Sequence, residues 1–137
     1  MNYLAHAYLS FDHPQILVGN IISDFVKGKQ KFDYPRDIQK GISLHRSIDT
    51  FTDSHSATKE AKQVFRSAYR LYSGAFIDIV YDHFLANDEN EFSESSLFEF
   101  SGRVYDTIEK NISLVPASFA RMFAFMKEQN WLFHYRT

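Results

Sequence analysis

Residues Gly41–His55, with the sequence GISLHRSIDTFTDSH, decide the fold because they form an amphipathic helix that carries polar groups inward. At about 100° per residue, the apolar side chains around this stretch form one stripe: Ile38, Ile42, Leu44 and Ile48. His45 and Asp49 lie within that stripe, one helical turn apart. A carboxylate removed from water is costly unless it is paired or binds a cation. The pair therefore predicts either a shared divalent metal ion or a buried structural hydrogen bond.

The composition indicates one helical domain with a large core. The chain has 137 residues, of which 45% are hydrophobic and 17% aromatic, so disorder is excluded. Only 5 glycines and 3 prolines are present, which favours long helices over many turns. The absence of cysteine excludes disulfides, zinc–thiolate sites and cysteine nucleophiles.

Several classes of protein are disfavoured by charge and hydropathy. A net charge of −2 is not that of a strongly basic nucleic-acid binder. No apolar run reaches the roughly 20 residues that a transmembrane helix needs. With no signal peptide visible at the N-terminus, we expect a cytoplasmic protein that binds neither nucleic acid nor membrane.

Basic side chains are concentrated in residues 27–46. This segment contains two acidic residues and six basic ones: Lys27, Lys29, Lys31, Arg36, Lys40 and Arg46. A basic strip on an acidic protein can steer an acidic partner, although a solvated loop would have the same composition.

Helical spacing predicts an all-α domain of about six or seven helices. The expected helices cover residues 1–11, 14–27, 36–51, 57–72, 75–86, 95–112 and 118–135. The helix over 75–86 is apolar on all sides, so we expect it to be central and next to the helix over 36–51. Asp78, Asp82 and His83 within it need partners, either in a site or in a structural network. His6 is interpreted as a core or hydrogen-bonded residue.

Five segments, in this order and at this spacing, make the chain similar to the acyl carrier protein phosphodiesterase family. They are MNYLAHAYLS at 1–10, GNIISDFVKG at 19–28, GISLHRSIDTFTDSH at 41–55, YDHFLA at 81–86 and NWLFHYRT at 130–137. The similarity extends over nearly the whole chain.

The resemblance implies a single HD-like helical domain, as in HD-type metal phosphohydrolases, in which His and Asp side chains hold a divalent ion. The ion expected is Mn²⁺, with Mg²⁺ as the alternative. The implied reaction removes 4′-phosphopantetheine from the serine of holo acyl carrier protein. The residues expected to bind metal are Asp24, His45 and Asp82. Those expected to act in catalysis are Asp24, Arg46, Asp49 and His83. Metal ions and nearby cations are suited to phosphodiester hydrolysis.

Two other functions remain open. After YDHFLA the chain continues NDENEF, where the family commonly has a more basic continuation, and it stops at Thr137, before the family's usual C-terminal extension. These departures are compatible with a catalytically impaired helical binding protein of the same fold. An HD-like hydrolase of another phosphodiester is the second alternative.

The expected partner, holo acyl carrier protein, is acidic. The residues of this chain that are expected to dock the carrier protein are therefore basic ones of the strip: Lys29, Lys31, Arg36 and Lys40. The helix over 118–135 carries many large apolar residues, which predicts an open hydrophobic face and a possible homodimer through it.

Overall fold

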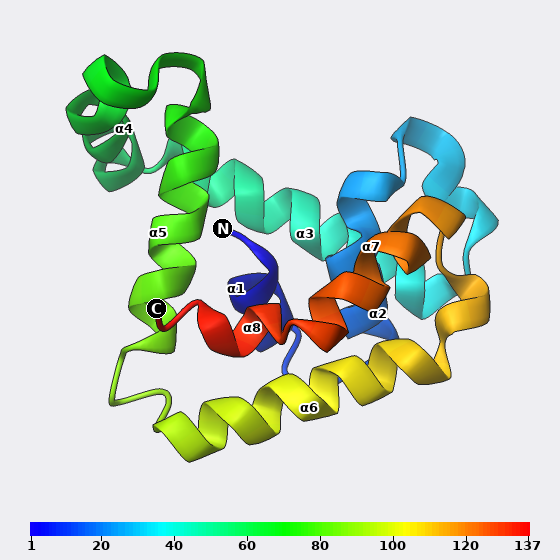
Figure 1. Ribbon diagram of the computed structural model, residues 1–137. Helices are drawn as coiled ribbons and strands as arrows, with labels where there is room; N and C mark the ends of the chain where they lie inside the picture. The colour runs from blue at the N-terminus through cyan, green and yellow to red at the C-terminus, as the bar shows by residue number, and fades with distance from the viewer.

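Eight α-helices and four short 3-10 helices make up the computed structural model, which describes all residues 1–137 (Figure 1). The α-helices are α1 (Tyr3–Tyr8), α2 (Pro14–Ile22), α3 (Arg36–Ser54), α4 (Ser56–Tyr69), α5 (Ser73–Ala86), α6 (Glu94–Lys110), α7 (Ala117–Glu128) and α8 (Trp131–His134). The 3-10 helices are η1 (Ser23–Phe25), η2 (Gly28–Asp33), η3 (Arg70–Tyr72) and η4 (Ile112–Leu114). No strand is present, so the all-α prediction is confirmed.

Helices α2 and α3 cross with their backbones in direct contact. A Cβ atom on Gly41 would overlap the carbonyl oxygen of Ile16, and one on Gly19 would overlap that of Ile38. Only glycine lets two helices approach this closely without steric overlap. The crossing therefore depends on a glycine in each helix.

The core lies where α1, α2 and α3 meet α6, α7 and α8. Its fully buried side chains include Leu4, Val18, Ile22, Ile38, Ile42, Leu97, Ile108, Phe119 and Leu132. The stripe predicted from residues 38 and 42 faces this core. Burial of apolar surface at about 25 cal/mol per Å² makes this cluster the main source of stability.

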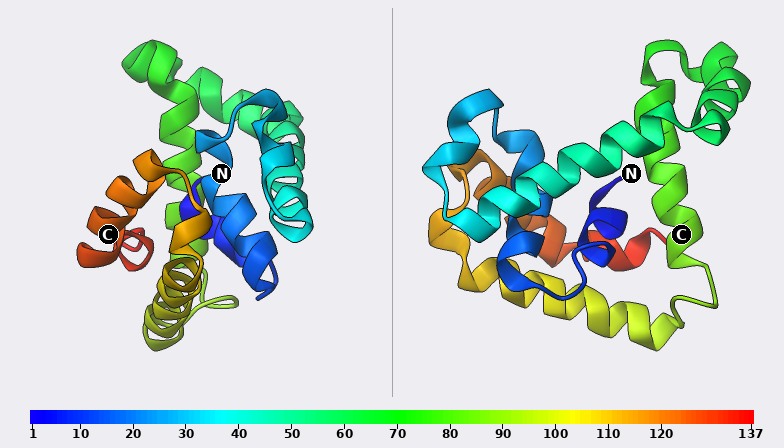
Figure 2. Two further views of the ribbon diagram at one scale, coloured as in Figure 1. Left: turned by 90° about the vertical axis from the view of Figure 1, so that its right-hand side faces the viewer. Right: turned by 180° about the vertical axis from the view of Figure 1, so that it is seen from behind.

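Helices α4 and α5 form a hairpin whose α4 end projects away from the core, while the last turns of α5 pack beside α1 and bury Ala86 (Figures 1 and 2). The expectation that the helix over 75–86 is central is therefore wrong. Ile79 and Phe84 on α5 are 48% and 65% exposed, and Val64 on α4 is 71% exposed. One side of α5 packs on α4 and another packs on α1, which accounts for apolar residues on two sides of the helix. The remaining apolar side chains face solvent.

Several predicted helix boundaries also differ from the structure. The helix predicted over 14–27 ends at Ile22 and continues as η1, while η2 lies in the region interpreted as a loop. Helix α3 extends to Ser54, and the ring of His55 then caps α4 by accepting a hydrogen bond from the Ala57 N–H at 3.1 Å.

The helix predicted over 118–135 is split in two, because Asn130 adopts a left-handed conformation with φ 49° and ψ 56°. The break places α8 against α6, and Phe119, Phe123, Met126 and Leu132 are buried, whereas Phe125 remains 57% exposed. The ring of Phe123 lies 6.3 Å from that of Tyr105 on α6, and Phe119 lies 5.5 Å from Phe25. Most of the C-terminal face that was expected to be open is therefore covered within the chain, and the homodimer stays a prediction.

Replacement of Gly41 by alanine is expected to lower the free energy of unfolding by about 3 kcal/mol, because the new methyl group forces α2 and α3 apart. Gly102→Ala is the matched control, since a Cβ at Gly102 on α6 would meet no atom within 4 Å. The control should be neutral or gain up to about 1 kcal/mol from helix propensity. Urea denaturation followed by circular dichroism measures both, and equal effects would contradict the role of the crossing.

Candidate functional site

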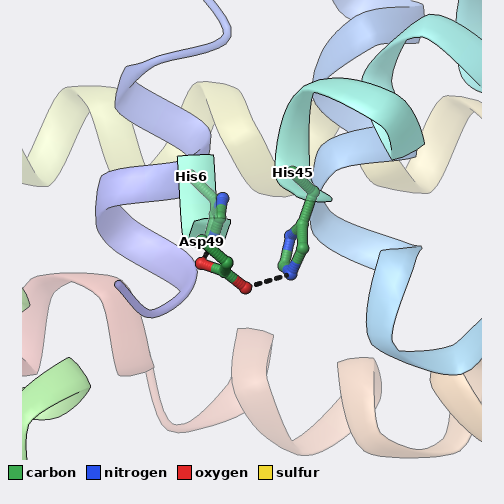
Figure 3. Close-up of side chains that lie close together, drawn as sticks. All are labelled: His6, His45 and Asp49. Atoms are coloured by element: carbon green, nitrogen blue, oxygen red, sulfur yellow. Dashed lines mark hydrogen bonds and ion pairs between the residues drawn. The ribbon is translucent and has the colours of Figure 1, made fainter. Parts of the chain in front are cut away.

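A cluster of two histidines and one aspartate lies between α1 and α3 (Figure 3). His6 comes from α1, and His45 and Asp49 come from successive turns of α3. Nε2 of His6 lies 3.0 Å from Oδ1 of Asp49, and Nε2 of His45 lies 3.1 Å from Oδ2 of the same carboxylate. The two imidazole rings are stacked, with centroids 3.7 Å apart and an interplanar angle of 11°. One ligand atom from each residue lies within 4.8 Å of the others, which is close enough to share a metal ion.

Asp24 adds a second carboxylate to the cluster. It lies on η1, immediately after α2, and its Oδ1 is 3.3 Å from Nε2 of His45. Its side chain is 68% exposed, whereas that of His45 is 7% exposed. The predicted association of Asp24 with His45 and Asp49 is therefore present, and it places one carboxylate at the solvent side of the cluster.

Asn20 positions both histidines. Its backbone carbonyl oxygen accepts a hydrogen bond from Nδ1 of His45 at 2.7 Å. Its side-chain amide donates to the carbonyl oxygen of His6 at 2.9 Å. Because a carbonyl can only accept, Nδ1 of His45 carries the proton, and the lone pair of neutral His45 lies on Nε2, facing the carboxylates. A hydrogen bond from the ring nitrogen that does not face the metal, such as Nδ1 of His45 here, is the usual way in which proteins orient a metal-ligating imidazole.

The charges of the cluster depend strongly on one another. Burial opposes a charge on His45, but Asp24 and Asp49 outweigh it and raise the pKa of His45 to about 9. The hydrogen bond with His45 lowers the pKa of Asp24. Burial also opposes ionisation of Asp49, yet the two histidines hold the pKa of that carboxyl well below its usual range. Without a metal, the two carboxylates therefore favour a proton on His45.

The donor set fits a divalent cation. Nε2 of His45 is buried and lies 3.3 Å from Oδ1 of Asp24 and 3.1 Å from Oδ2 of Asp49, so one imidazole nitrogen and two carboxylate oxygens converge. Buried polar atoms almost always have a partner. An imidazole nitrogen aimed between carboxylate oxygens would be satisfied by a cation such as Mn²⁺, which binds both donor types.

A hollow of about 400 Å³ opens beside the cluster. Its lining includes Asp24, His45 and Asp49 together with the cationic residues Lys27 and Arg46. Nη2 of Arg46 donates to the carbonyl oxygen of Val26 at 3.2 Å, which fixes the guanidinium against η1. The hollow thus combines acidic metal-type ligands with cations that can bind an anionic group.

Asp82 and His83 are not part of the cluster, which differs from the sequence prediction. The carboxylate of Asp82 is fully buried and accepts hydrogen bonds from the backbone N–H groups of Asn2, Leu4 and Ala5 at 3.0, 2.8 and 3.3 Å. It therefore caps the first turn of α1.

The ring of His83 bonds elsewhere. Its Nδ1 donates to the carbonyl oxygen of Tyr135 at 2.7 Å, near the C-terminus. Helices α3 and α5 do not enclose the site together, because the side chains of the cluster come from α1, α3 and η1.

His6 is the cluster residue that sequence reasoning missed. It is buried, as predicted for a core residue, but it also contacts Asp49. Helical spacing could not reveal the contact because the two residues are on different helices. The only signal was its place in MNYLAHAYLS, one of the five segments that carry the family resemblance.

These features define an all-helical protein with a buried histidine–aspartate cluster beside a cation-lined hollow. The family profile described as acyl carrier protein phosphodiesterase matches residues 1–137. The chain belongs to this family.

Three curated bacterial relatives, each named acyl carrier protein phosphodiesterase, illustrate the similarity. The relative from Photorhabdus laumondii is 35% identical over 136 residues, which cover 98% of this chain and 69% of the relative. That from Yersinia pestis is 34% identical over 98% of this chain and 70% of its own length. The relative from an Enterobacter species is 34% identical over 99% of this chain and 71% of its own length. No solved structure matches the chain significantly. None of its helices has the length and apolarity needed to cross a bilayer.

The stability of the protein is expected to depend on pH through Asp82. Burial outweighs the three N–H donors and raises the pKa of Asp82 to about 6, above the ordinary value of about 3.9. The folded state therefore binds this proton more tightly than the unfolded state. The contribution of Asp82 to the free energy of unfolding thus falls as pH rises from about 4 to about 6.

Asp82→Asn removes this dependence. The quantity to compare is the free energy of unfolding of the parent minus that of the variant. This difference should be about 2–3 kcal/mol larger at pH 4 than at pH 7. Asp106→Asn, at an exposed position of α6, is the control and should give a difference that does not vary with pH. Urea titrations at both pH values measure the effect, and a flat difference for Asp82→Asn would contradict it.

Proposed function

We propose that this chain hydrolyses the phosphodiester that joins 4′-phosphopantetheine to the serine of holo acyl carrier protein. Water adds to phosphorus, the serine oxygen leaves as the hydroxyl of the apo protein, and 4′-phosphopantetheine is released. The main support is the combination of the His6–His45–Asp49 cluster with the adjacent hollow that contains Lys27 and Arg46. Family membership and the names of the relatives support the same substrate.

The proposed reaction requires a divalent cation, preferably Mn²⁺, held by His6, His45 and Asp49 with Asp24. Such an ion would supply positive charge for the phosphoryl oxygens and make a bound water acidic enough to be a nucleophile at neutral pH. Nε2 of His45 is kept available for it by the hydrogen bond from Nδ1 to Asn20.

The remaining residues of the hollow act on the substrate itself. Arg46 and Lys27 bind the phosphodiester oxygens and stabilise the negative charge that develops in the transition state. Asp24, whose side chain is 68% exposed, would accept a proton from water in the hollow when its carboxylate is not bound to the ion. Asp82 acts indirectly in this proposal, because it fixes the helix that carries His6.

The basic strip beside the hollow is the proposed docking surface for the acidic carrier protein. Lys29 and Lys31 lie on η2, directly after two residues that line the hollow, Lys27 and Gly28. Arg36 and Lys40 lie on the first turns of α3, and Lys40 is 3.6 Å from Asp37. Exposed charges of this kind raise association rates at low salt and are screened beyond about 8–10 Å at physiological ionic strength.

The direct test is incubation of the protein with holo acyl carrier protein and Mn²⁺, followed by mass spectrometry of the carrier protein. The parent should release 4′-phosphopantetheine, and His45→Ala should lower kcat/KM at least about 100-fold because it removes a central ligand. Calorimetry should show that His45→Ala loses Mn²⁺ binding, while His134→Ala, at an exposed histidine of α8, retains it.

The result also separates the alternative functions. Mn²⁺ binding without release from the carrier protein would reject this substrate, and a panel of nucleotide phosphodiesters would then test a different hydrolase. Release that is unaffected by His45→Ala would reject the proposed site.

Reversal of two charges on η2, Lys29→Glu with Lys31→Glu, is expected to raise KM for holo acyl carrier protein about tenfold at low salt, with a smaller effect on kcat. The difference should shrink at 0.5 M salt because the charges are screened. Lys110→Glu with Arg121→Glu, at exposed positions of α6 and α7, is the control of equal charge change. A KM equal to that of the control at low salt would refute docking at η2.

A further inference from the structure

A second cationic surface lies on the α4–α5 hairpin, outside the basic strip of residues 27–46. A hollow of about 930 Å³ is present where η3 leads into α5. Its lining includes Lys59, Lys62, Arg66, Arg70, Leu71 and Gly74. The part of the hairpin that carries these residues projects from the core in the views from front and back (Figures 1 and 2).

The cations of this hollow are not neutralised by the chain itself. Residues 56–74 contain four basic side chains and one acidic side chain, which gives this segment a charge of +3 on a chain with a net charge of −2. The ion pairs of the structure involve none of these four basic residues. Like charges gathered in a concave surface create a positive potential that attracts an anionic partner.

Helix α5 contributes both to the hollow, through Ser73 and Gly74, and to a contact near the histidine–aspartate cluster, through Asp78. Gly74 in the hollow and Asp78 are four residues apart, so they share one face of the helix. Oδ1 of Asp78 lies 2.8 Å from the amino nitrogen of Met1, which is 3.7 Å from Oδ1 of Asp49 in the cluster. The basic strip begins before α3, whereas the α4–α5 hairpin follows the C-terminal end of α3, so the two cationic segments lie toward opposite ends of the helix that carries His45 and Asp49 (Figure 1).

The lining favours a protein as the occupant. Leu71 is 97% exposed among the cations, and a small anion would leave this side chain in water. A protein partner can cover it with an apolar side chain while placing acidic residues against the lysines and arginines.

We propose that the α4–α5 hollow is a second docking surface for the acidic carrier protein, which would then contact the enzyme on both sides of the cluster. The identity of the partner rests on the proposed function, but the surface is defined by the hairpin residues alone. The two cationic surfaces would orient the carrier protein so that its modified serine faces the cluster.

The test measures binding of fluorescently labelled apo acyl carrier protein, which has no phosphodiester and so reports docking without hydrolysis. Lys59→Glu with Arg66→Glu should weaken binding about tenfold at low salt and much less at 0.5 M salt. The control pair Lys110→Glu with Arg121→Glu should change it less than twofold. Leu71→Ser, which alters no charge, should weaken binding about threefold at either salt concentration. Thermal melting checks that every variant is folded.

Three results would overturn the proposal. Equal weakening by both charge-reversed pairs would show a general field effect, and unchanged binding in the hairpin variants would show that the hollow is not used. The same variants can be tested for binding to phosphatidylglycerol vesicles. If the hairpin variants lose vesicle binding but still bind apo acyl carrier protein, the surface belongs to lipid. A parent that binds through the hollow but does not hydrolyse holo acyl carrier protein would refute the proposed function and leave the docking surface supported.

Discussion

The close contact of α2 and α3 at Gly19 and Gly41 is the constraint on which the site depends. It brings the backbone of Asn20, the residue after Gly19, within 2.7 Å of the ring of His45, one turn after Gly41. A side chain at either glycine would move these groups apart by more than a hydrogen bond tolerates. The same approach lets η1 place Asp24 against His45. Helix packing and the chemistry of the cluster are therefore set by one steric requirement.

Helix α1 brings the third member of the cluster, and it depends on other elements for its position. A helix of six residues is not stable by itself in water. Asp82 of α5 accepts hydrogen bonds from its first N–H groups, and the amide of Asn20 donates to the carbonyl oxygen of His6. Because Asp82 is fully buried, its carboxylate provides the partners that these backbone groups would otherwise lack.

The parts of the protein that follow from local spacing could be predicted from the sequence. The inward pair His45 and Asp49 is a property of one helix, so helical periodicity was sufficient to find it. The position of His6 beside Asp49 could not be predicted in this way because it depends on how two helices pack. Asp82 was correctly identified as a polar residue that needs partners, but periodicity does not show whether those partners are side chains or backbone.

The errors in the fold have a similar origin. An apolar residue such as Phe84 looks the same in sequence whether it faces a neighbouring helix or solvent, so α5 was expected to be central. Asn130 ends α7 by adopting a left-handed conformation, for which the surrounding helical pattern gave no warning. Both features are decided by tertiary contacts rather than by local preference.

The capping of α1 has a consequence for the order of assembly during synthesis. All the cluster residues lie within the first 49 positions, so the ribosome makes them early. The carboxylate that fixes α1 lies at residue 82, and the hydroxyl of Tyr3 on α1 contacts the sulfur of Met122 at 3.5 Å. We therefore expect the nascent chain to carry all the cluster residues while α1 is still mobile, and to order the cluster only after α5 has emerged.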